Sequence, residues 1–244
     1  MSPRRMFATT GRVLMQLRHD PRTVVLILGM PLVLLTLMKY VFDAQPKAFD
    51  ASAPMLLGIF PLVIMFLVTS IATLRERTSG TLDRLMTQPI SKLDFIFGYG
   101  LAFSIVGFVQ ALLATLLIVG PLDVTVNGGT GPLLVTAVAA AFLGTSFGLF
   151  VSAFAHNEFQ AVQFVMPIIM PQILLCGMFI TRDQMADWLY HISDWLPLTY
   201  SVDAMKQATT YADWTDDLTK DLLIVFGSAI IALILGAITI RRRE

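Results

Sequence analysis

The most concentrated group of charged and hydroxyl side chains lies at residues 75–91, which read RERTSGTLDRLMTQPIS. Hydroxyl side chains can cap a short helix over 81–87, Gly80 permits a sharp turn before it, and Pro89 would end it. This helix would present three charged side chains to solvent: Glu76, Asp83 and Arg84. The pattern indicates a surface for polar contacts, and the alternative is an ordinary solvated loop.

Catalytic and metal-binding combinations are missing from the sequence. His19, His156 and His191 fall in separate segments, and Cys176 is the single cysteine, which excludes an internal disulfide and a zinc site built from cysteines. No Gly-Lys pair occurs, so the sequence has no phosphate-binding loop of the GxxxxGK[ST] type. The sequence therefore predicts no enzyme activity, no metal and no cofactor on this chain.

The elements that must position these residues follow from an apolar composition. Of the 244 residues, 56% are hydrophobic and 14% are charged, whereas an average soluble domain has about 25% charged residues. So few charges cannot cover a globule of this size, which excludes a soluble enzyme or a nucleic-acid-binding protein. The high apolar content also excludes a disordered chain. We predict an integral membrane protein.

Six apolar windows are long enough to cross a bilayer as helices, which takes about 20 residues each. They are residues 23–42, 55–74, 96–120, 132–155, 159–181 and 222–240. Their length favours helices over the short alternating strands of a membrane barrel. The first window is longer than the apolar core of a cleaved signal peptide, so we expect it to remain as a span. The predicted fold is all-α, with one six-helix transmembrane domain over residues 1–244.

The charges between the windows predict which side each connection faces. With the N-terminus in the cytoplasm, the inner side holds twelve Lys and Arg residues and six acids, whereas the outer side holds five and eleven. Positive charge is concentrated on the cytoplasmic side of membrane proteins. Both termini are therefore predicted to be cytoplasmic, in a multi-pass protein of the plasma membrane.

Two segments outside the windows have amphipathic patterns. Residues 4–19 can form a basic helix in the headgroup plane, which either only anchors to lipid or also touches a cytoplasmic partner. In the outer connection 182–221, apolar residues recur at helical spacing from Trp188 to Leu196 and stop at Pro197. This segment either caps an outer mouth with re-entrant half-helices or forms an interfacial belt. The proposed cap residues are Trp188, Trp195, Pro197, Tyr200 and Asp203.

The fifth window contains Pro167 and Pro171, one helical turn apart. Each proline removes a backbone hydrogen bond, so we expect this helix to bend within the membrane. We hypothesise that Gln163 and Gln172 face a transport path beside the bend, and the alternative is that both glutamines only satisfy the freed carbonyls. The candidate path-lining residues are Gln163, Phe164, Met170 and Gln172.

Two stretches resemble ABC-2 type permeases, the drug- and lipid-exporting membrane subunits of ABC transporters. Residues 75–91 match the family's loop after the second span: an Arg-Glu start, Gly-Thr-Leu, an acid, Arg, two apolar residues, then Pro and Ser. The second stretch joins LLCGMFI (174–180) and ADWLYHISDWLPLTYSVDAMK (186–206). Two departures stand out, because Cys176 replaces a common Ser and Gln172 makes the fifth span unusually polar.

The resemblance implies a division of labour between subunits. In the family, separate cytoplasmic ATPase subunits bind ATP and Mg and drive the permease. Two permease copies, or this chain and a sister permease, would face each other, with the first, second and fifth spans lining a central path. The residues that the resemblance assigns to ATPase coupling are Arg75, Glu76, Gly80, Thr81, Leu82, Asp83 and Arg84.

The spans themselves bear on the energy source and the cargo. Lys39, near the outer end of its window, is the one charged residue in any window, which argues against a proton-driven transporter. Apolar spans without a large outer domain predict amphiphilic or hydrophobic cargo, drug- or lipid-like, that moves outward among membrane lipids. Polysaccharide or lipid-linked glycan cargo and a non-transporting membrane scaffold remain alternatives. An ion channel lacks a recognisable filter sequence.

Overall fold

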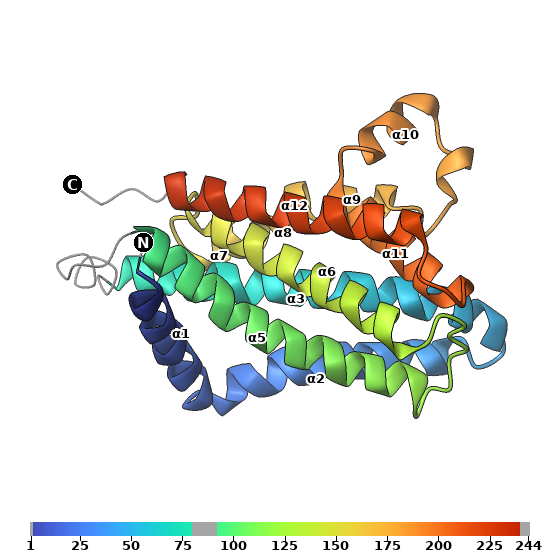
Figure 1. Cartoon of the computed structure of the whole chain (residues 1–244), viewed down its shortest axis with the longest axis horizontal. Coiled ribbons are helices and arrows are strands. Elements are labelled where there is room, and N and C mark those ends of the chain that lie inside the picture. The colour runs from blue at the N-terminus through green and yellow to red at the C-terminus, as the bar shows by residue number, and fades with distance from the viewer. Residues whose placement is uncertain (1, 80–91, 240–244) are drawn as a thin grey trace.

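Long helices running side by side dominate the computed structural model, which describes residues 2–79 and 92–239 (Figure 1). Within these residues all regular structure is helical, and six helical stretches are long and apolar enough to cross a membrane. They are α2 (Pro21–Val41), α3 (Pro46–Thr78), α5 (Lys92–Val119), α6 (Thr130–Ser152), the stretch Glu158–Leu175, and α12 (Asp216–Thr239). The predicted all-α membrane fold with six spans is confirmed.

The predicted N-terminal helix is present as α1 (Pro3–Arg18), set at an angle to α2 and packed against α5 (Figure 1). The turn between α1 and α2 contains Asp20, the N-cap of α2. Its carboxylate accepts hydrogen bonds from the Thr23 N–H at 3.3 Å and the Thr23 hydroxyl at 2.6 Å. This cap fixes the direction in which the chain leaves the amphipathic helix.

The second span is longer than its apolar window predicts. α3 begins at Pro46, a residue type favoured at the first position of a helix, so most of the outer loop expected at 43–54 is helical. At its other end, residues 75–78 form the last helical turn rather than the start of a loop. The short helix predicted over 81–87 lies outside the described residues.

The core lies where α3 packs against α6. A Cβ atom added to Gly144 would lie 2.2 Å from the Leu62 carbonyl oxygen, and one added to Gly148 would lie 2.6 Å from the Phe66 carbonyl oxygen. Only glycine permits the two backbones to approach this closely. The small-residue row Ala140, Gly144 and Gly148 is therefore a helix-packing surface.

The fifth span is interrupted twice, giving α7 (Glu158–Gln163), α8 (Val165–Ile168) and α9 (Met170–Leu175). A short 3₁₀ turn, η1 (Arg182–Gln184), and two helices follow it: α10 (Asp187–Ser193) and α11 (Pro197–Thr210). α12 starts at Asp216, earlier than its window predicts, because acidic residues in the first turn interact favourably with the helix dipole. The outer connection therefore ends before residue 216 and not at 221.

Candidate functional site

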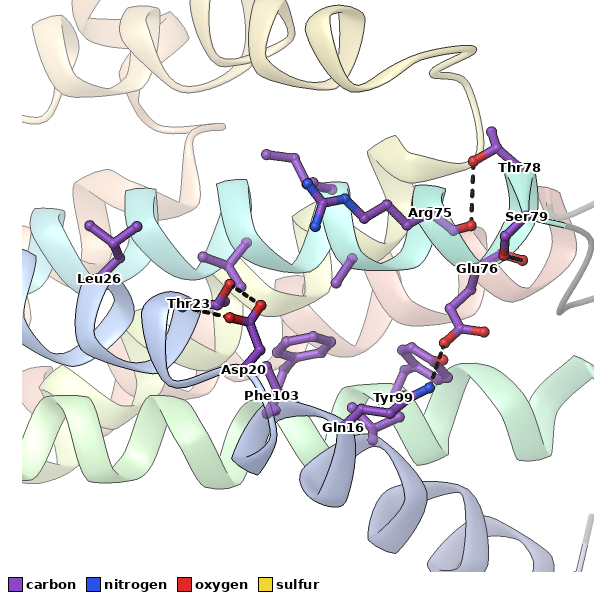
Figure 2. Close-up of a pocket in the computed structure, with 15 residues that line it drawn as sticks. Gln16, Asp20, Thr23, Leu26, Arg75, Glu76, Thr78, Ser79, Tyr99 and Phe103 are labelled. Atoms are coloured by element: carbon purple, nitrogen blue, oxygen red, sulfur yellow. Dashed lines mark hydrogen bonds between the residues drawn. The ribbon is translucent and has the colours of Figure 1, made fainter.

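A polar cluster joins three helices at the end of the bundle where α1 begins and α12 ends (Figures 1 and 2). Glu76, in the last turn of α3, accepts hydrogen bonds from Arg12 Nη1 at 3.4 Å and from Gln16 Nε2 at 3.2 Å. Arg12 Nη2 also donates to the Tyr99 hydroxyl at 2.8 Å. Through these contacts, the end of α3 is held to α1 and to α5.

The neighbouring Arg75 joins α3 to the fifth span. Its guanidinium makes a bidentate ion pair with Glu158, at 2.7 Å from Nε and 3.0 Å from Nη2. Both side chains are more than half exposed, so the pair contributes little to stability. The ion pair instead positions the helices, because through it one turn of α3 contacts the first residue of α7 as well as the amphipathic helix α1.

Arg75 and Glu76 are the members of the predicted coupling segment that the structure describes. The remaining members lie outside the described residues: Gly80, Thr81, Leu82, Asp83 and Arg84. The sequence patterns did not indicate that Arg12 and Tyr99 contact Glu76. An Arg in an amphipathic helix and a Tyr in a span carry no signal of their partner until the helices are placed.

A cavity of about 720 Å³ lies beside this cluster, between α1, α2, α3 and α5. Figure 2 shows the side chains that surround it. They are Val13, Gln16, Leu17, Asp20, Thr23, Leu26, Val68, Ile71, Ala72, Arg75, Glu76, Thr78, Ser79, Tyr99 and Phe103. Most of the wall is apolar, with charged groups contributed by the turn before α2 and the end of α3. Sequence patterns did not predict this cavity, because four separated segments form it.

The two glutamines of the fifth span do not face the same side. Gln163 is exposed, whereas Gln172 is buried, with 4% of its surface accessible. Gln172 Nε2 donates to the Ile168 carbonyl at 2.8 Å, and its Oε1 accepts from the Leu198 N–H at 3.3 Å, in the first turn of α11. These contacts connect α9 to α11, and the hypothesis that both glutamines line a transport path stays a prediction.

The other two candidate path residues differ from each other. Phe164 is half-buried and packs against the core, whereas Met170 is exposed. Met170 shares its exposure with Met166 and Leu174, which lie on the same side of the span at helical spacing. Gln163 and Met170 are thus exposed on the surface of this chain, whereas Gln172 is buried.

The outer segment is organised by Arg182, which sequence patterns did not single out. Arg182 Nε donates to Ser193 Oγ at 2.9 Å, and the guanidinium pairs with Asp194 and, at 3.5 Å, with Asp203. Asp203 therefore pairs within the outer segment. These contacts connect the end of α10 to α11.

The remaining cap residues are two exposed tryptophans and two residues of α11, Pro197 and Tyr200. Trp188 and Trp195 are 64% and 87% exposed, as an interfacial location requires. Pro197 is the first residue of α11, and the preceding helix already ends at Ser193. The Tyr200 hydroxyl donates to the Asp194 carbonyl at 2.7 Å, and burial raises the pKa of this phenol, so it stays protonated as a donor.

A buried glutamine in α5 satisfies a backbone carbonyl that a proline in α2 leaves without a donor. Pro31 interrupts the backbone ladder of α2 and leaves the Ile27 carbonyl without its helical donor. Gln110 Nε2, on α5, donates to this carbonyl at 2.7 Å. The buried glutamine thus repairs a proline site in a neighbouring span.

The described residues offer binding surfaces rather than reactive groups. Among residues 2–79 and 92–239, no three His, Cys, Asp or Glu side chains gather closely enough to hold a metal ion. Cys176 is buried, and burial raises the pKa of its thiol, which disfavours the reactive thiolate.

Comparison with known proteins gives one matching family model, the ABC-2 type transporter, over residues 4–209. The chain is 30% identical over 187 residues to the inner membrane transport permease YhhJ of Escherichia coli K12, covering 74% of this chain and 48% of that protein. It is 27% identical over 154 residues to the probable multidrug ABC transporter permease YbhR of the same strain, with coverages of 63% and 42%. It is 25% identical over 164 residues to ABC transporter G family member 20 of Dictyostelium discoideum, with coverages of 67% and 22%. The chain thus spans less than half the length of each of these relatives.

Proposed function

This chain belongs to the ABC-2 type transporter family, and from that premise we propose that it is the membrane-spanning permease subunit of an ATP-driven exporter. Its cargo would be amphiphilic or hydrophobic, drug- or lipid-like, and would move outward across a plasma membrane. ATP and Mg would be bound by separate cytoplasmic ATPase subunits. The permease would act as a dimer with a second copy or a sister permease.

The observation that carries this proposal is the set of contacts made by the last turn of α3. Glu76 connects that turn to α1, and Arg75 connects it to α7. This turn is the start of residues 75–91, which the resemblance assigns to ATPase coupling. A displacement of that segment by an ATPase would therefore reach both the interfacial helix and the proline-interrupted fifth span.

Two findings support the cargo and the direction of insertion. The name of the relative YbhR includes multidrug transport, which favours a drug-like cargo over a glycan. The excess of Lys and Arg on the side of both termini favours a cytoplasmic location for that side. If the cargo were a polysaccharide or a lipid-linked glycan, the protein would transport no small amphiphile. If the chain were a scaffold, it would transport nothing.

The coupling assignment is tested by Glu76→Ala and Gly80→Val, with the exposed outer residue Asp213→Asn as control. Each variant is reconstituted in liposomes with its ATPase partner, and ATP-dependent movement of a fluorescent amphiphile is measured. We expect membrane insertion in all three, and loss of transport in the first two alone. Normal transport by both Glu76→Ala and Gly80→Val would show that the coupling assignment is wrong.

The orientation is tested by cysteine labelling in a Cys176→Ala background. A cysteine at position 187 should react with an impermeant reagent applied to intact cells, and one at position 83 should react only after permeabilisation. The opposite pattern would overturn the proposed topology while leaving family membership unaffected.

A further inference from the structure

The cavity between α1, α2, α3 and α5 has an uneven charge balance. Arg75 is engaged by Glu158, and Glu76 is engaged by Arg12. Asp20 is the remaining charged group in the wall, and within the described residues it has no ion-pair partner within 4.0 Å. Asp20 and Arg75 attract each other at longer range, but no cation contacts the Asp20 carboxylate directly.

The state of Asp20 follows from its local contacts. Hydrogen bonds from Thr23 lower the pKa of its carboxyl, so the group is ionised at neutral pH. Its role as a helix cap explains why an oxygen acceptor is needed at this position, but Asn caps helices as well as Asp does. The negative charge also interacts favourably with the dipole of α2, as it does at the start of α12.

The rest of the wall is suited to an apolar body. Leu26, Val68 and Phe103 come from three different helices and face the same space. The volume of about 720 Å³ falls in the range of about 300–1,000 Å³ that is typical of sites for single small molecules.

We propose that this cavity binds a drug-sized organic cation with an apolar tail, with its cationic group beside Asp20. As a cargo site the assignment rests on the proposed function and names the class of cargo. As a binding site it stands apart from transport, because binding to the cavity needs neither ATP nor a partner. A cationic amphiphile partitions into the membrane interface, which is where the amphipathic α1 places this cavity.

Binding is tested with the purified chain in phosphatidylcholine nanodiscs and a photoreactive alkyltrimethylammonium probe. Crosslinked peptides are mapped by mass spectrometry, and Kd values come from competition with unlabelled dodecyltrimethylammonium. We expect labelling of the cavity wall on α2, α3 and α5. The cation should compete, whereas an alkyl sulfonate of the same chain length should not.

Two variants separate charge from volume. Asp20→Asn keeps the helix cap and removes the charge, so the Kd for the cation should rise about 5- to 10-fold, as expected for one water-exposed charge pair. Asp43→Asn, an exposed carboxylate before α3, is the matched control and should leave the Kd unchanged. Ala72→Phe fills the cavity and should abolish labelling, and size-exclusion and thermal unfolding profiles check that each variant is folded.

Four outcomes would overturn the assignment. They are an unchanged Kd in Asp20→Asn, equal competition by the sulfonate, persistent labelling in Ala72→Phe, and displacement of the probe by phosphatidylethanolamine in the disc, which would make the cavity a lipid site. The transport assay distinguishes this assignment from the proposed function. If the cation binds but is not moved by ATP hydrolysis, it is not cargo. If another amphiphile is transported while the cation does not bind the cavity, only the binding-site assignment is wrong and the proposed function stands.

Discussion

The second and fifth spans each contain two internal prolines, yet only the fifth span is interrupted. α3 runs unbroken from Pro46 to Thr78 through Pro54 and Pro61, whereas the stretch around Pro167 and Pro171 is divided into α7, α8 and α9. The prolines inside α3 are buried, and both prolines of the fifth span are exposed. Of the apolar window of α3, 56% is buried within the chain, compared with 22% for the fifth span.

This difference shows that a proline's surroundings decide whether a helix breaks. Each proline frees a carbonyl one turn earlier, and in hydrocarbon that carbonyl needs a partner or a packed neighbour. α2 supports the same conclusion, because it is little buried overall but remains continuous where Gln110 satisfies the carbonyl freed by Pro31. Spacing adds to the effect, since prolines four residues apart remove hydrogen bonds from successive turns.

The largest predicted effect comes from separating α3 and α6. Gly144→Leu would place side-chain atoms against the Leu62 carbonyl, where even a Cβ lies at 2.2 Å. Forcing the backbones apart should cost about 3 kcal/mol or more, enough to prevent recovery of folded protein. The measurement is the monodisperse fraction in detergent and its unfolding temperature.

The matched control for that variant is Gly227→Leu on α12, because a Cβ at Gly227 meets nothing within 4 Å. This control should express and unfold like the original chain. If Gly144→Leu were equally stable, close approach of α3 and α6 would not be what keeps α3 continuous.

The next effect concerns the link from the interrupted span to α11. Gln172→Leu removes hydrogen bonds to the Ile168 carbonyl and from the Leu198 N–H, so we expect a loss of about 1–2 kcal/mol in unfolding free energy. The preference among transported amphiphiles should stay the same. A changed cargo preference with unchanged stability would show that Gln172 faces the transport path.

A smaller effect is expected at the repaired proline of α2. Gln110→Leu leaves the Ile27 carbonyl without its donor, but it also removes the buried Gln110 Oε1, which has no hydrogen-bond partner among the described residues. The two effects partly cancel, so we expect a loss of about 0.5–1 kcal/mol. Gln163→Leu, at an exposed position, is the control and should leave the unfolding temperature unchanged.

Much of this comparison could be predicted from the sequence, and the rest depends on helix placement. Six spans, the helix before them and the disturbance at Pro167 and Pro171 follow from hydropathy, amphipathic spacing and proline chemistry. The partner of a freed carbonyl does not, because Gln110 and Ile27 lie 83 positions apart. The same limit applies to the cavity and to Glu76, whose partners come from different helices. Helix ends were also misplaced, since windows of apolar residues omit the polar turns of α3 and α12.

The most direct comparison replaces one proline in each span by alanine, and it includes the smallest expected effect on stability, that of Pro171→Ala. Pro61→Ala should cost about 1–2 kcal/mol, because it removes buried ring atoms and leaves a gap in the packed interior. Pro171→Ala should change the unfolding free energy by less than about 0.5 kcal/mol, since its ring is exposed. Its new N–H can donate to the Pro167 carbonyl and join α8 to α9. Spin labels at Phe159 and Leu174, both exposed, would then move towards the separation of about 22 Å for an unbroken helix at 1.5 Å per residue. If that separation stays unchanged and Pro61→Ala costs as little as Pro171→Ala, burial of the proline is not what distinguishes the two spans.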